Sequence, residues 1–85
     1  MLKILRTFGE KSLEWKELKF IKAHDNGIDD AGWKYLVKHA HLMPGLAEID
    51  LEGNQITKVT KKDLEGWKKL LWVSFDRNPL GQESL

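Results

Sequence analysis

The side chains of this chain that could bind a metal ion or carry a proton include three histidines, His24, His39 and His41. Two ligands of one metal on a helix stand three or four positions apart, because they must project from the same side. His39 and His41 are two positions apart and point to different sides of a helix. The histidines are therefore interpreted as solvated residues, and no metal site is predicted.

The aspartates Asp25, Asp29 and Asp30 are the second group that could bind a cation. An EF-hand loop requires a central glycine and a closing glutamate at fixed positions, and these are missing. The sequence also has no cysteine, no phosphate-binding glycine loop and no nucleophile elbow. We therefore expect a protein that is not an enzyme and that binds no cofactor.

The chain is organised around a short pattern that occurs three times. Its second copy consists of Leu46, Ile49, Leu51, Asn54 and Ile56. The first copy has Leu18, Ile21, Ala23, Asn26 and Ile28 at the same places, and the third has Leu70, Val73, Phe75, Asn78 and Leu80. The alternation of apolar and polar residues predicts a strand with one buried face. The asparagines at 26, 54 and 78 give periods of 28 and 24 residues.

This pattern resembles the leucine-rich repeat, whose period is about 20–29 residues. The continuation of the first copy through Asp30, Gly32 and Leu36 resembles the ribonuclease-inhibitor-like class of these repeats. The resemblance implies an α/β fold, a short leucine-rich repeat solenoid. About three parallel strands are expected on its concave face, with a helix or helical turns on its convex face.

The resemblance also gives the three asparagines a structural role. Each is expected to turn inward and to form hydrogen bonds with backbone groups of its own and neighbouring turns, as a buried amide requires. This predicted asparagine ladder consists of Asn26, Asn54 and Asn78. Asn26-Gly27 alone would also suit a tight hairpin turn. The later asparagines are followed by Gln55 and Pro79, so the shared feature is the asparagine, and we reject the hairpin.

The repeats divide a single predicted domain, residues 1–85, into four parts. These are an N-terminal cap or partial repeat (1–17), a first repeat (18–45), a second repeat (46–69) and a truncated third repeat (70–85). Asp29 or Asp30 is expected to cap a helix in the first repeat, and Thr60 to cap a turn at 61–65. The side chains of that first helix expected to face the strands are Trp33, Leu36, Val37 and Ala40.

In this register, the outward side chains of the three strands line up in rows across the sheet. The predicted rows are Phe20, Glu48 and Trp72, then Lys22, Asp50 and Ser74, then His24, Glu52 and Asp76. Aromatic side chains beside charged groups are typical of a protein-binding patch. An ordinary solvated sheet face, with lateral pairing of Lys22 and Asp50, is the alternative interpretation.

Composition limits the partners and the compartment. Fourteen basic residues against thirteen acidic ones give a net charge of +1, which argues against nucleic-acid binding. The lack of cysteine favours a reducing, intracellular compartment, with the cytoplasm as the first expectation. An organelle is the alternative, because residues 1–8 mix apolar and basic side chains as an organellar presequence does.

The sequence therefore predicts a non-catalytic protein-interaction module, a small adaptor or accessory subunit held in a lasting complex. Binding is expected through the concave strand face and the bare C-terminal end, where self-association is a further possibility. One alternative is an inhibitor or regulator of an enzyme. A less favoured one is a membrane-surface protein that uses a basic amphipathic helix containing Lys61, Lys62, Lys68 and Lys69.

Overall fold

The computed structural model describes residues 16–81 and residue 84. Three short strands form a parallel sheet in these residues, in the order β1 (Phe20–Lys22), β2 (Glu48–Asp50) and β3 (Trp72–Ser74). The predicted cap at 1–17 lies almost wholly outside the described residues. The described part is thus a small α/β fold with a three-stranded parallel sheet, which agrees with the predicted class at this level.

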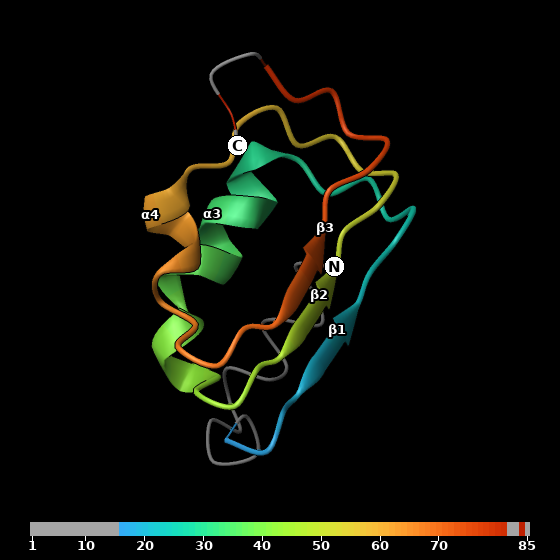
Figure 1. Cartoon of the computed structure of the whole chain (residues 1–85). Helices are drawn as coiled ribbons and strands as arrows, with labels where there is room; N and C mark the ends of the chain where they lie inside the picture. The colour runs from blue at the N-terminus through green and yellow to red at the C-terminus, as the bar shows by residue number, and fades with distance from the viewer. Residues whose placement is uncertain (1–15, 82–83, 85) are drawn as a thin grey trace.

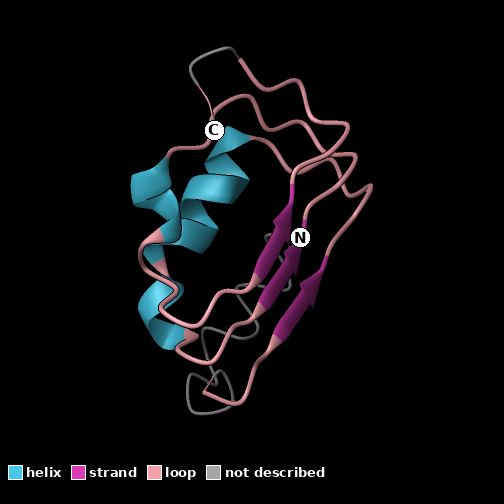
Figure 2. Ribbon diagram, viewed as in Figure 1, coloured by secondary structure: helices cyan, strands magenta, loops and turns pink. Residues whose placement is uncertain are grey.

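The connections between the strands carry the helices. Helix α3 (Asp30–Lys38) and the 3-10 helix η1 (Ala40–Leu42) lie between β1 and β2, and helix α4 (Lys61–Leu64) lies between β2 and β3. Both α-helices lie on the same side of the sheet (Figures 1 and 2). No described helix or strand covers the opposite face, so the described residues form two layers and leave one face of the sheet open.

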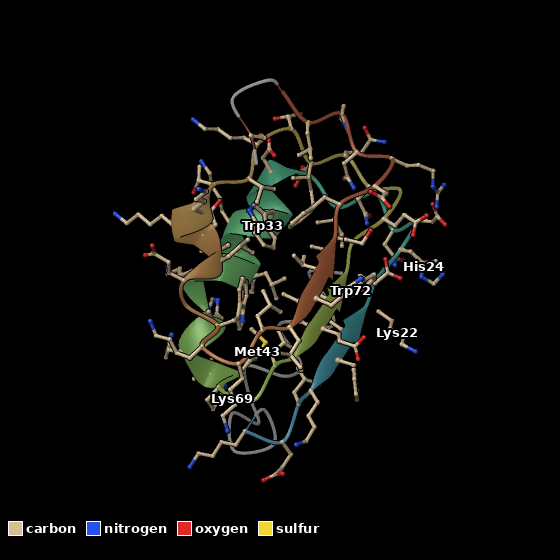
Figure 3. All side chains as sticks on the ribbon, in the orientation of Figure 1. Lys22, His24, Trp33, Met43, Lys69 and Trp72 are labelled. Atoms are coloured by element: carbon tan, nitrogen blue, oxygen red, sulfur yellow. The ribbon has the colours of Figure 1, made fainter. Side chains whose placement is uncertain are left out.

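The core lies between the sheet and the helices, where Figure 3 shows Trp33 and Met43. Trp33, Leu36 and Ala40 are each no more than 3% exposed, as the helical spacing predicts, and Val37 packs against this core while partly buried. The alternating apolar residues of the second repeat complete the core.

Two N-terminal caps explain where the helices begin. The carboxylate of Asp29 accepts a hydrogen bond from the backbone N–H of Gly32 at 3.0 Å, so Asp29 caps α3 and Asp30 does not. Thr60 caps α4, as predicted, in a reciprocal pair with Asp63. Such a pair satisfies backbone donors that a first helical turn leaves free.

Asn54 connects the first two turns. Its amide is 2% exposed and donates to the carbonyl oxygens of Ala23 and Leu51 at 3.1 and 2.8 Å. Its Oδ1 accepts from the backbone N–H groups of Asn26 and Ile28 at 3.0 and 2.9 Å. The buried amide is therefore fully used, which is the condition for burying it.

Asn78 repeats this arrangement one turn later, and Asn26 does not. Asn78 donates to the carbonyl oxygen of Leu51 at 2.8 Å and accepts from the backbone N–H of Ile56 at 3.0 Å. The side chain of Asn26 is instead exposed and donates to the carbonyl oxygen of His24 at 2.9 Å. The buried amide of Asn54 and the half-buried amide of Asn78 each accept from the turn before their own. The segment before β1 that would have to supply those groups to Asn26 lies largely outside the described residues.

The residue before each asparagine has a left-handed backbone conformation. The φ angles are 55° at Asp25, 72° at Gly53 and 59° at Arg77. Only Gly53 belongs to the residue type that adopts this conformation without cost. In three consecutive turns, the residue before the asparagine therefore has a left-handed φ angle. The types of these three residues did not indicate this repetition.

Candidate protein-binding surface

The open face of the sheet carries the side chains predicted to form rows. The backbone register pairs Phe20 with Glu48 and Glu48 with Trp72, and it pairs Lys22 with Asp50 and Asp50 with Ser74. Strand alternation places these side chains opposite the core. In Figure 3, Lys22 and His24 lie on the side of the sheet away from the helices. The first two predicted rows therefore exist as rows.

The third row lies beyond the ends of the strands. Backbone hydrogen bonds still join Asp25 to Glu52 and Gly53 to Asp76, at 2.9 and 2.8 Å, so the three chains stay side by side past the strands. The imidazole of His24 pairs with Asp50 rather than with Glu52, at 3.4 Å between Nδ1 and Oδ2. Backbone hydrogen bonds thus hold this row together, while His24 and Glu52 form ion pairs with Asp50 and Arg77, which lie outside the row.

Two aromatic side chains stand exposed in the first row. Phe20 is 52% and Trp72 is 48% exposed, whereas Trp33 and Trp67, on the core side, are 1% and 3% exposed. Exposed aromatic side chains are unusual enough on a small domain to mark a candidate binding surface.

Ser74 does not fit the predicted patch. It is 8% exposed, and its hydroxyl oxygen accepts a weak hydrogen bond from the backbone N–H of Asp76 at 3.4 Å. Ser74 lies at the β3 end of its row, and its short side chain bonds to its own turn instead of standing out from the sheet. The other eight predicted side chains are at least partly accessible; they are Phe20, Lys22, His24, Glu48, Asp50, Glu52, Trp72 and Asp76.

Arg77 is a charged residue of this surface that sequence reasoning missed. Its guanidinium lies 3.4 Å from the carboxylate of Asp25 and 3.2 Å from that of Glu52, so it joins all three turns. The hydrogen bond to Glu52 and the charge of Asp25 raise the pKa of Arg77 further above its ordinary value. Arg77 lies in a turn, where strand alternation says nothing about direction. Glu52, one turn earlier, and Asp25, two turns earlier, are the acidic residues of the sequence that could have indicated this position.

Leu71 is a second residue that the sequence analysis did not single out. It is 86% exposed and directly precedes β3, whose far edge pairs with no strand of the described residues. In the third copy of the pattern, Leu71 directly follows Leu70, where the alternation of apolar and polar residues does not predict which way a side chain points. A large, exposed apolar side chain therefore adjoins the edge of β3 that no described strand pairs.

The basic segment 61–72 does not form one amphipathic helix. Helix α4 ends at Leu64, and Trp67 turns into the core beside Trp33, with 5.7 Å between ring centroids. Among the described residues, no helix is long and apolar enough to span a membrane.

A polar hollow of about 330 Å³ lies on the helix side of the molecule. The carboxylate of Asp30 accepts hydrogen bonds from the hydroxyl and the backbone N–H of Thr57, and these bonds lower the pKa of Asp30 below its ordinary value. Asp63 accepts from the indole N–H of Trp33 at 3.2 Å. Both carboxylates thus bind their own chain. The described residues contain no group of three or more His, Cys, Asp or Glu side chains arranged to hold a metal.

Comparison with protein-family models, with curated proteins and with solved structures finds no match for this chain. What the surface can do must therefore be argued from its own residues.

Proposed function

We propose that this chain is a short leucine-rich repeat solenoid that binds another protein through its open sheet face and performs no catalysis. Three features support the architecture: the repeated pattern, the interlocked amides of Asn54 and Asn78, and the shared left-handed conformation before each asparagine. Solenoids of this kind stack repeats whose helices cover one side of the strands and leave the other side free.

The observation that carries the binding proposal is the exposure of Phe20 and Trp72 in one row. Each buries only about half of its surface, because strand alternation directs both rings away from the core. Burying aromatic side chains in an interface is worth about 25 cal/mol per Å² of apolar surface removed from water. Charged side chains around the two rings supply the polar rim of such an interface.

The partial burial of the third copy of the pattern supports a place in a larger assembly. In the second repeat, Leu46, Ile49 and Ile56 are completely buried, while their counterparts Leu70, Val73 and Leu80 are only partly buried. The described residues supply no cover for these three positions, and apolar residues of a solenoid repeat need one. We propose that a partner subunit provides it.

Affinity capture from the native source tests the binding proposal. A Phe20→Thr/Trp72→Thr double variant keeps β-forming residues at both strand positions and should lose the proteins that the wild type retains. Lys34→Ala/Lys38→Ala is the control, since it truncates two exposed side chains of α3 on the opposite side of the molecule. Circular dichroism must show that both variants are folded. Identical capture by wild type and double variant would show that the open face is not the binding surface.

A further inference from the structure

Glu48 differs from the other two carboxylates of the middle turn. Asp50 lies 3.4 Å from the imidazole of His24, and Glu52 lies 3.2 Å from the guanidinium of Arg77. No described residue forms an ion pair or a side-chain hydrogen bond with the exposed carboxylate of Glu48, which stands between Phe20 and Trp72 in the first row. Within residues 16–81, the row is therefore a negative charge without an ionic partner, flanked by two exposed aromatic rings.

The spacing of the row suits a cation held against one of its rings. Phe20 and Trp72 are separated by two strand spacings, about 9–10 Å at the backbone. A planar group in contact with a ring on each side needs the rings about 7–8 Å apart. The backbones are farther apart than that, and the side chain of Glu48 projects from the same face between the two rings, so its carboxylate is within reach of a cation held against either ring.

We propose that the row of Phe20, Glu48 and Trp72 binds one cationic side chain, an arginine or a lysine, of the partner protein. This inference rests on the proposed function and names the chemistry of its ligand. A cation is attracted to the faces of aromatic rings, most strongly to that of tryptophan. The carboxylate of Glu48 compensates the charge, so the cation keeps an ionic partner when it leaves water.

Two arguments narrow the chemical identity of the ligand. An arginine is favoured over a lysine, because its planar guanidinium stacks on rings and binds a carboxylate through two N–H groups. Lys22 lies two positions after Phe20 on the same face of β1 and is exposed. Its charge repels a second cation beside the first. The site should therefore take a single arginine whose neighbours along the partner segment are neutral or acidic.

Nuclear magnetic resonance titration tests this inference with a defined probe. The probe is the blocked peptide acetyl-Ser-Gly-Arg-Gly-Ser-amide, and its counterpart carries citrulline, which has the same shape without the charge. The arginine peptide should shift the indole N–H resonance of Trp72 in a saturable way with a millimolar dissociation constant. The citrulline peptide should bind about fivefold or more weakly, the factor expected for an ion pair at a partly exposed site.

Variants assign the effect to Glu48. Glu48→Gln keeps the shape of the side chain and should weaken binding of the arginine peptide about fivefold while leaving the citrulline peptide unaffected. Glu65→Gln makes the same change on the helix side of the molecule and should leave both affinities unchanged. Equal binding of the two peptides, equal binding by Glu48→Gln and wild type, or no saturable shift at Trp72 up to about 20 mM peptide would each overturn the inference.

The proposed function can survive that failure. If the Phe20→Thr/Trp72→Thr variant loses the captured proteins while Glu48→Gln keeps them, the face binds proteins without needing a cation. If neither variant changes capture, both proposals are wrong.

Discussion

Asn54 and Asn26 occupy equivalent places in neighbouring turns, yet their side chains contribute very differently. The amide of Asn54 is buried and accepts from two backbone N–H groups of the turn before it, while the amide of Asn26 is exposed and bonds to one carbonyl oxygen. Leaving a buried donor or acceptor without a partner costs about 1–3 kcal/mol. The energetic importance of a repeated residue therefore depends on which neighbouring turn its side chain reaches.

We expect Asn54→Ala to lower the free energy of unfolding by at least about 3 kcal/mol, because it leaves several buried backbone groups unpaired. Asn26→Ala is the matched control and should cost less than about 1 kcal/mol. Urea unfolding followed by circular dichroism measures both. An Asn54→Ala chain that does not fold, beside a folded Asn26→Ala chain, would agree with this expectation; similar losses in the two variants would contradict it.

At the scale of elements, Asp30 joins helix α3 to the connection that leads into α4. It stands at the start of α3, but its carboxylate accepts hydrogen bonds from Thr57 in the following repeat. The parallel arrangement brings these segments together although they are 27 residues apart in the chain. Asp29 performs the capping, which leaves Asp30 free to connect the two repeats.

This connection should make stability depend on pH. The hydrogen bonds from Thr57 hold the pKa of Asp30 below its ordinary value of 3.8 in the folded state. A lowered folded-state pKa stabilises the fold above the unfolded pKa, and this stabilisation is lost as the pH falls through the folded-state value. Asp30→Asn should thus cost about 1 kcal/mol at neutral pH, discounted for partial solvent exposure, and almost nothing near pH ~2.

Urea unfolding of wild type and Asp30→Asn at both pH values measures this difference. Thr57→Val removes the hydroxyl donor and should reduce the same pH-dependent contribution. If the cost of Asp30→Asn does not change between the two pH values, the carboxylate contributes no charge-dependent stability.

For the whole molecule, the decisive feature is that one end of the repeat array is covered less well than its middle. The second repeat has a neighbour on each side, while β3 pairs with β2 alone among the described strands. An unpaired edge strand beside exposed apolar side chains is prone to pair with another chain. Leu71, 86% exposed, stands at that edge.

We therefore expect the isolated chain to self-associate at high concentration through the β3 edge. Leu71→Lys should raise the dissociation constant about tenfold or more, because burying a leucine is worth about 1.5–3 kcal/mol. Ala31→Lys adds the same charge on an exposed position of α3 and should leave association unchanged. Sedimentation velocity over a range of concentrations distinguishes the two. Equal association of both variants would place the contact elsewhere.

The sequence by itself determined the parts of the structure that depend on local periodicity. Alternating apolar residues decided which side of each strand faces the core. The spacing within each copy of the pattern is the same in all three copies, and it decided the register of Phe20, Glu48 and Trp72. Helical spacing likewise placed Trp33 and Leu36 in the core. These features follow from the geometry of one strand or one helix, so residue order suffices to predict them.

Only the tertiary structure decided which polar groups of different repeats meet. It gave the capping of α3 to Asp29, left Asn26 exposed, buried Ser74 and placed Arg77 between Asp25 and Glu52. It thereby left Glu48, between two aromatic rings, without an ionic partner among the described residues. These outcomes depend on the distances between side chains of neighbouring turns, which lie 24 to 28 residues apart in the chain. Such distances differ by ångströms even for side chains of the same type. Periodicity predicts a row of residues, but only the packed turns determine which of its charges is free to bind.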